Sequence, residues 1–284
     1  MRGLGALDVV SGLPPVVVDL FDLLTRLGDP WLLLGVLATL YAASDRVGLD
    51  RRRVGFVLAT AFLALGVTLA LKSAFALPRP PGALEEGYGF PSGHALGSTV
   101  VWGTAALALD TGRRRVRLAV AGGVVPLVAA SRVVIGVHYF VDVVVGVAVG
   151  LVLVGLVFAT LWRDPATPPT HAAVDRVFAL AAVAALAALV LSSSVNTLLT
   201  VGATLGGWVG WRLVEPTVAS VGTPLSPRGT VFALAGLPAV LGGLLALDAA
   251  AAAATIPDTL TMGLAGGCVA LLFALPRLAR LAVD

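Results

Sequence analysis

Charged side chains are scarce in this 284-residue chain, at 12%, whereas hydrophobic side chains make up 58% of it. A soluble globular chain carries roughly 25% charged residues, so this sequence lacks the charge to cover a water-facing surface. The mean hydropathy of +0.98 also excludes a disordered chain and a coiled coil, because both are rich in polar side chains. The composition therefore predicts an all-α, polytopic membrane protein.

Cysteine and lysine are nearly absent. The single cysteine, Cys268, excludes a disulfide within the chain and a metal cluster built from cysteines. Of the 19 basic residues, only Lys72 is a lysine, and it lies inside an apolar segment. A charge at such a place is costly unless it has a partner or a function, so Lys72 marks a candidate site.

Long apolar runs dominate the rest of the sequence. A transmembrane helix needs about 20 mostly apolar residues. The uncharged stretch from Val177 to Trp211 is too long for one crossing, and we divide it at Ser192–Asn196, where polar residues favour a turn. We expect nine membrane-spanning helices, at about residues 28–45, 54–77, 92–109, 116–134, 139–162, 174–191, 196–211, 229–247 and 259–276.

The basic residues divide unevenly between the two ends of these spans. If the spans alternate, 14 of them share the side of the connections 46–53 and 110–117. The other side keeps five, which are Arg2, Arg26, Lys72, Arg79 and Arg132. Because arginine-rich loops favour the cytoplasm, we expect a plasma-membrane protein with its N-terminus outside and its C-terminus in the cytoplasm. The basic loops suit anionic membrane lipids and indicate no nucleic-acid partner.

Three short blocks hold nearly all the polar side chains expected at membrane depth. They are residues 72–80 (KSAFALPRP), 90–94 (FPSGH) and 131–142 (SRVVIGVHYFVD). Each block falls at the outer end of its predicted span, and the bounds of the spans do not depend on these residues. We therefore expect the blocks to converge at one extracytoplasmic site.

Three cations in these blocks suit a phosphate monoester or a diphosphate. Lys72 and Arg79 are seven residues apart, so a helix that continued to Pro80 would point them the same way. Arg132 would be the third cation, and the planar guanidinium of arginine matches the oxygens of a phosphate.

The blocks also contain backbone donors and a nucleophile. Pro91 is expected to be the first residue of a helix, which would leave the N–H groups of the next three residues free to bind an anion. These residues are Ser92, Gly93 and His94. His138 and Asp142 are four residues apart, so the carboxylate can fix the tautomer of the imidazole and leave its other nitrogen as a nucleophile. His94 is then available to protonate the departing oxygen.

The pattern Lys-x6-Arg-Pro, Pro-Ser-Gly-His and Ser-Arg-x5-His-x3-Asp resembles the type 2 phosphatidic acid phosphatase (PAP2) and vanadium haloperoxidase superfamily, in its integral-membrane lipid phosphatase branch. The resemblance implies that His138 attacks phosphorus to form a phosphohistidine, that Asp142 orients it and that His94 protonates the leaving group. It also implies no metal and no other cofactor. The implied phosphate ligands are Lys72, Arg79, Ser92, Gly93 and Arg132.

The resemblance covers about residues 28–191 and implies a PAP2-like catalytic core of six helices. The chain would then have three parts. Residues 1–27 are predicted to be an interfacial amphipathic segment, residues 28–191 the core, and residues 192–284 additional transmembrane helices. The role of the last part stays open between packing, formation of a homodimer and lipid sequestration.

We expect a phosphatase that acts on a lipid phosphate or a polyprenyl diphosphate, because an apolar tail would reach the site from the membrane lipids. Phosphatidate, phosphatidylglycerol phosphate and polyprenyl diphosphates stay open as substrates. A lipid phosphotransferase, and a non-catalytic transporter or flippase of lipid or phosphate, are the alternatives. Glu85 and Glu86 are interpreted as solvated charges in the outer loop, and the spacing of Gly146 and Gly150 predicts close helix packing.

Overall fold

The computed structural model describes residues 12–213 and 224–283. All regular structure in these two stretches is helical, with no strand, so the predicted all-α class is confirmed. Residues 1–11 of the predicted interfacial segment, with Arg2, lie outside the described residues. The same holds for residues 214–223, in the connection after the seventh predicted span, and for residue 284.

Every predicted span corresponds to a helix. The chain begins with α2 (Pro15–Thr25), the short 3₁₀ helix η1 (Arg26–Gly28), α3 (Pro30–Ala42) and α4 (Ser44–Val47). The long helices of the core are α5 (Arg51–Phe75), α6 (Gly93–Ala108), α7 (Arg114–Val134), α8 (Phe140–Leu161) and α9 (His171–Leu191). The last helices are α10 (Val195–Leu213), α12 (Pro227–Ala252) and α13 (Asp258–Val283).

Not all of these helices are long enough to cross a bilayer alone. Among the described residues, α5, α7, α8, α9, α12 and α13 are long and apolar enough, and α2–η1 with α3 forms a further pair, bent by 44°. The helix α6 has 16 residues, which is about 24 Å at 1.5 Å per residue, less than the roughly 30 Å of a hydrocarbon core. We therefore expect the N-terminus of α6 to lie below the membrane surface.

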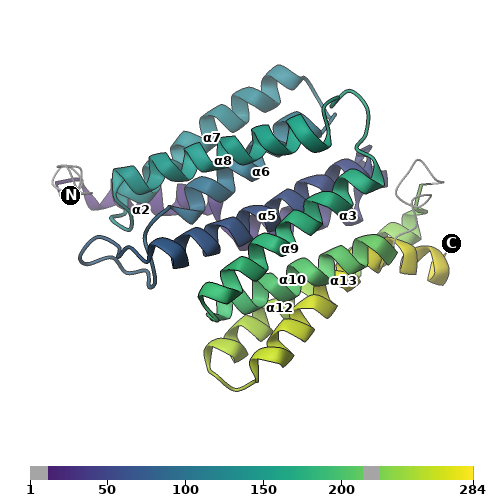
Figure 1. Cartoon of the computed structure of the whole chain (residues 1–284). Helices are drawn as coiled ribbons and strands as arrows, with labels where there is room; N and C mark the ends of the chain where they lie inside the picture. The colour runs from purple at the N-terminus through teal and green to yellow at the C-terminus, as the bar shows by residue number, and fades with distance from the viewer. Residues whose placement is uncertain (1–11, 214–223, 284) are drawn as a thin grey trace.

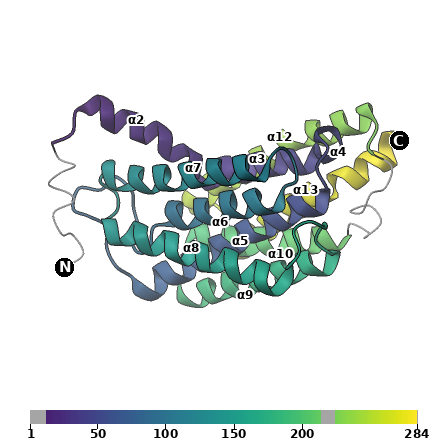
Figure 2. The same cartoon turned by 90° about the horizontal axis from the view of Figure 1, so that it is seen from above.

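The helices run back and forth, so the connections gather at two ends of the bundle (Figure 1). The connections 76–92 and 135–139 lie together at the left end in Figure 1, where α2 also lies against α7 (Figure 2). At the opposite end, Arg53 binds the carbonyl oxygens of Ala108 and Pro165 at 2.8 and 2.9 Å and pairs with Asp110. The convergence of the three polar blocks at one end is thus confirmed, whereas the side of the membrane that each end faces stays a prediction.

The C-terminal helices share the apolar core of the bundle. Phe273 of α13 packs against Tyr41 of α3 and Phe178 of α9, with ring centroids 4.9 and 5.5 Å apart. Along α10, Gly202 and Gly206 touch the backbone of α13 so closely that a side chain at either position would collide with it. The helices α10, α12 and α13 pack against α9, α5 and α3. The division of the chain at residue 192 stays a prediction.

Candidate active site

The end of α5 separates Lys72 from Arg79. The helix stops at Phe75, and Ala76 adopts a left-handed φ of 48°. Pro78 disfavours helical backbone at the residue before it, so α5 does not reach Pro80. The prediction that Lys72 and Arg79 share a helix face is therefore wrong, and Arg79 lies in the loop that follows.

Residues 76–92, here called the return loop, carry Arg79 back over the end of α5. The N–H of Gly89 donates to the carbonyl oxygen of Leu77 at 2.8 Å and closes the base of the loop. Lys72 donates from Nζ to the carbonyl oxygen of Tyr88, also at 2.8 Å. A Cβ atom on Gly89 would lie 3.1 Å from the Cα of Arg79, so only a small residue fits at this closure.

The N-terminus of α6 follows the return loop. Ser92 is the N-cap, and its Oγ accepts the N–H of Ala95 at 3.4 Å. The prediction that Pro91 is the first helical residue is therefore wrong by two positions. The N–H of Ser92 donates to the carbonyl oxygen of Asp142 at 2.9 Å and is not free for an anion. Gly93 and His94 are the first two helical residues, where N–H groups have no partner within the helix.

Helix α8 holds this N-terminus in place. A Cβ atom on Gly146 would lie 2.7 Å from the carbonyl oxygen of Ser92, and one on Gly150 would lie 2.7 Å from the Cβ of Thr99. The close packing predicted from these two glycines is confirmed. Because the contact at Gly146 is made with Ser92 itself, it determines where the N-terminus of α6 lies.

Arg132 and His138 are both buried, at 1% relative exposure each. Arg132 lies near the end of α7, and its carbonyl oxygen accepts the N–H of His138 at 3.1 Å. Its Nη1 donates to the Thr25 hydroxyl at 3.1 Å. Thr25, the last residue of α2, is a site residue that sequence reasoning missed, since a threonine in an amphipathic segment gives no signal.

The imidazole of His138 lies between Asp142 and Arg79. Its Nδ1 faces Oδ2 of Asp142 at 3.6 Å, slightly beyond hydrogen-bonding distance, and Oδ2 accepts the N–H of Tyr139 at 3.0 Å. Its Nε2 lies 3.2 Å from Nη1 of Arg79. Burial lowers the pKa of His138, which lies in the connection between α7 and α8, although Asp142 acts in the opposite direction. A lower pKa favours the neutral ring that a nucleophile needs.

Glu85 of the return loop binds both arginines of the site. One carboxylate oxygen lies 3.0 Å from Nη2 of Arg79, and the other contacts Nη2 of Arg132. Burial alone would raise the pKa of Glu85, but the two guanidinium groups outweigh it and hold this pKa below its usual value. The interpretation of Glu85 as a solvated charge is therefore wrong, whereas Glu86 is exposed as expected.

These contacts bring seven of the eight predicted site residues into one connected cluster. The eighth, His94, directly follows Gly93 as the second residue of α6. Lys72 adjoins Gly93, since a Cβ atom on that glycine would lie 3.8 Å from the lysine Cε. An anion held by Arg79 and Arg132 would therefore lie beside Nε2 of His138.

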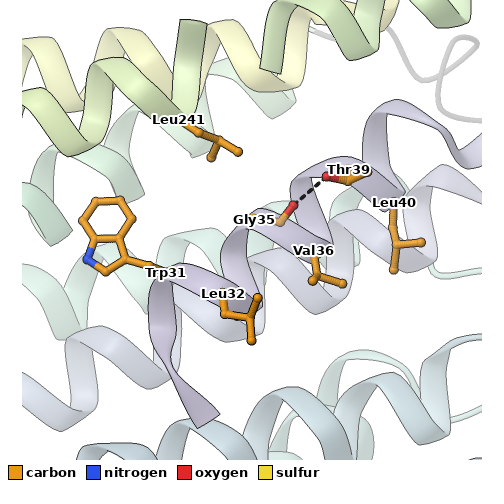
Figure 3. A pocket seen from close by; sticks show the side chains of 7 residues that line it. All are labelled: Trp31, Leu32, Gly35, Val36, Thr39, Leu40 and Leu241. Atoms are coloured by element: carbon orange, nitrogen blue, oxygen red, sulfur yellow. Dashed lines mark hydrogen bonds between the residues drawn. The ribbon is translucent and has the colours of Figure 1, made fainter. Parts of the chain in front are cut away.

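A hollow of about 380 Å³ lies between α3 and α12, and none of the residues of this cluster lines it (Figure 3). It is lined by Trp31, Leu32, Gly35, Val36, Thr39, Leu40 and Leu241. The hydroxyl of Thr39 donates to the carbonyl oxygen of Gly35 at 2.8 Å. The lining contains no titratable side chain, so this groove suits hydrocarbon and offers no acid, base or nucleophile.

Comparison with known proteins gives one match. Residues 53–166 match the sequence model of the PAP2 superfamily, a range that contains all three polar blocks. No curated protein and no solved structure matches the chain.

Proposed function

We propose that this protein is an integral-membrane phosphatase that hydrolyses a lipid phosphate or an isoprenoid diphosphate, because residues 53–166 match the sequence model of the PAP2 superfamily. One observation carries the proposal. A single carboxylate, that of Glu85, is bound by both Arg79 and Arg132, and Arg79 also contacts Nε2 of His138. The same arrangement would hold a phosphate with its phosphorus next to the ring nitrogen.

In the first step, Nε2 of His138 attacks phosphorus and forms an N–P bond. The P–O bond to the lipid breaks, and the leaving oxygen takes a proton from His94. The proton on Nδ1 faces the Asp142 carboxylate, which favours the positive charge that the ring gains. The products of this step are a phosphohistidine and the lipid alcohol, or the lipid monophosphate when the substrate is a diphosphate.

In the second step, a water molecule attacks the phosphohistidine. His94, now neutral, takes a proton from the water, a reversal of its role in the first step. The N–P bond breaks with its electron pair returning to Nε2, and inorganic phosphate leaves. Together, the two steps return His138 and His94 to their starting forms.

The cations and the N-terminus of α6 would stabilise the charge on the phosphoryl oxygens. Arg79 and Arg132 supply fixed planar donors, and Lys72 supplies a compact charge beside Gly93. Donors that are already in place cost little reorganisation when the transition state forms. In this proposal they supply the charge stabilisation that other phosphatases obtain from metal ions.

The membrane explains the class of substrate. The site lies at one end of an apolar bundle and is expected to lie below the membrane surface because α6 is short. A phosphate on an apolar tail could therefore reach the cations from the outer leaflet. We propose the extracytoplasmic side for this end because the opposite end gathers most of the arginines.

The test is a phosphate-release assay of the purified protein in detergent with phosphatidate, phosphatidylglycerol phosphate and a polyprenyl diphosphate. We expect release from at least one substrate, and ³²P trapped on histidine after an acid-free quench. His138→Ala should abolish both signals. His171→Ala, which changes a histidine stacked on Trp211 outside the site, is the matched control and should retain both.

Other outcomes of this assay separate the alternatives. Product carrying an added alcohol in place of water would show a phosphotransferase. Lipid movement across vesicles by a protein that releases no phosphate would show a transporter or flippase, and the proposal would be wrong. A label that persists in His138→Ala would place the nucleophile elsewhere.

A further inference from the structure

The return loop supplies a protein oxygen to each cation of the phosphate site. Glu85 binds Arg79 and Arg132 through its carboxylate. The carbonyl oxygen of Tyr88 accepts Nζ of Lys72 at 2.8 Å, and that of Glu86 accepts Nε of Arg79 at 3.2 Å. The donors that would hold phosphate oxygens are thus already bound to oxygens of the protein itself.

We propose that Glu85 is an internal competitor of phosphate: its carboxylate leaves Arg79 and Arg132 when substrate binds, and returns to them as inorganic phosphate leaves. The inference rests on the proposed function, because it takes these two arginines to be ligands of the substrate phosphate. A carboxylate and a phosphate offer a guanidinium the same kind of charge-assisted acceptor. The two anions therefore exclude one another from the same donors.

The burial of Arg132 explains why a competitor is needed. Its side chain is 2% exposed, and apart from Glu85 its side-chain partner is the neutral hydroxyl of Thr25. A buried cation without an anionic partner is strongly destabilising. An exchange of Glu85 for phosphate keeps Arg132 compensated before, during and after turnover.

The local backbone allows Glu85 to move while Arg79 stays in place. Gly82 and Gly87 flank the glutamate and have φ values of 80° and 79°, in the left-handed region that favours glycine. Leu84, next to Glu85, is 97% exposed. The segment between the two glycines is therefore held by charge contacts more than by apolar packing.

The base of the loop is fixed independently of this segment. The hydrogen bond between Gly89 and Leu77 closes it, and Gly89 packs against the backbone of Arg79. Arg79 also donates from Nη1 to the carbonyl oxygen of Val137 at 3.1 Å. The Glu85 carboxylate can therefore leave, and the contact of Arg79 with the carbonyl oxygen of Glu86 can break, while Arg79 stays beside His138. The expected motion is thus confined to residues 82–87.

Competition has different consequences for substrate and product. The apparent affinity for any anion is the intrinsic affinity multiplied by the fraction of time that Glu85 is away from the arginines. A lipid substrate also binds through its tail, which adds apolar burial, whereas inorganic phosphate has no tail. The substrate can therefore bind against the competitor, while the product is readily released.

The test compares Glu85→Gln with Glu86→Gln. The first substitution keeps the size of the side chain and removes the competing charge. The second makes the same change at a neighbour whose side chain is exposed and which contacts Arg79 through its backbone. We measure the inhibition constants of inorganic phosphate and orthovanadate against lipid phosphate hydrolysis.

If Glu85 occupies the arginines about nine-tenths of the time or more, both constants should fall at least about tenfold in Glu85→Gln. They should stay at the parent value in Glu86→Gln. Unchanged or higher constants in Glu85→Gln would overturn the proposal, because Glu85 would then be a structural partner or a helper of phosphate binding.

A second measurement uses the parent protein and does not depend on the folding of a variant. When orthovanadate is added, amide hydrogen exchange should accelerate at residues 82–87 and slow at residues 93–96. Slower exchange in both segments would mean that the loop closes over the anion, and the proposal would be wrong.

The failure of the proposed function can be told apart from the failure of this inference. If the parent protein shows no phosphatase activity, the proposed function is wrong. The binding of phosphate can still be followed by measuring Tm at increasing phosphate concentrations. A larger rise in Tm per added phosphate in Glu85→Gln than in the parent would support competition, and an equal or smaller rise would overturn it.

Discussion

Nη1 of Arg79 lies 3.2 Å from Nε2 of His138. The nitrogen proposed as the nucleophile is therefore in contact with the residue proposed to hold the phosphate. Nη2 of the same guanidinium lies 3.0 Å from Glu85, so one planar group places a carboxylate and the proposed nucleophile side by side. This relationship depends on the shape of arginine as well as on its charge.

We expect Arg79→Lys to lower kcat by about 100-fold, because a misplacement of about 1 Å can cost that much in rate. An ammonium is a point charge and cannot bridge two groups in a fixed plane. The measurement is kcat and KM on the lipid phosphate that the parent hydrolyses best. Arg46→Lys, at an exposed position at the opposite end of the bundle, is the control and should leave kcat unchanged. A normal kcat in Arg79→Lys would show that Arg79 contributes charge alone.

The residues that gather at the site were predictable because alternating spans bring their ends together. When the spans between two polar blocks are counted correctly, the alternation of the spans places both blocks at the same end of the bundle. This result does not depend on the conformations of the loops. The spacing of Gly146 and Gly150 likewise predicted a close helix contact, since it depends only on helical periodicity.

Local geometry was harder to predict. The seven-residue spacing of Lys72 and Arg79 suggested a shared helix face, but Pro78 ends the helix earlier, and a loop then brings Arg79 to the same place. Glu85 gave no signal, because a glutamate in a loop has no periodicity and its partner Arg132 is 47 residues away in the sequence. Contacts between loops and distant helices become visible only when the chain has folded.

Gly146→Ala should destabilise the protein and reduce activity together. The new methyl group would lie 2.7 Å from the carbonyl oxygen of Ser92, so α6 and α8 must separate, which typically costs about 1–3 kcal/mol. The N-terminus of α6 would move with Ser92, and kcat should fall. The checks are thermal unfolding in detergent and kcat.

The same helix offers a control for this substitution. A Cβ atom on Gly155 would meet nothing within 4 Å, and alanine favours a helix over glycine by about 1 kcal/mol. Gly155→Ala should therefore preserve kcat and keep or raise the unfolding temperature. If both variants behave alike, the contact between Gly146 and Ser92 does not position the site.

The orientation is tested with single cysteines on a background without Cys268. Leu84→Cys places a thiol in the return loop at a residue that is 97% exposed, and Thr111→Cys places one in the connection between α6 and α7. In intact cells, an impermeant maleimide should label the first and not the second, and both after permeabilisation. The reverse pattern would place the active site on the cytoplasmic side. It would also contradict the proposal that substrate reaches the site from the outer leaflet.

The last prediction concerns the single lysine. Lys72 reaches the site from α5, with its Cε 3.8 Å from the place where a Cβ of Gly93 would lie and its Nζ 2.8 Å from the carbonyl oxygen of Tyr88. Arginine would keep the charge, but its wide planar group needs room for five donors. A third guanidinium should crowd the other two and move the phosphate away from His138.

We therefore expect Lys72→Arg to lower kcat by about 100-fold while the unfolding temperature stays close to that of the parent. Lys72→Ala is the companion variant, since it removes the charge and makes space. A loss in Lys72→Arg as large as in Lys72→Ala would show that the compact shape of lysine matters as much as its charge. If Lys72→Arg instead keeps a normal kcat, the lysine supplies only charge at the rim, and the three cations do not pack around one phosphate.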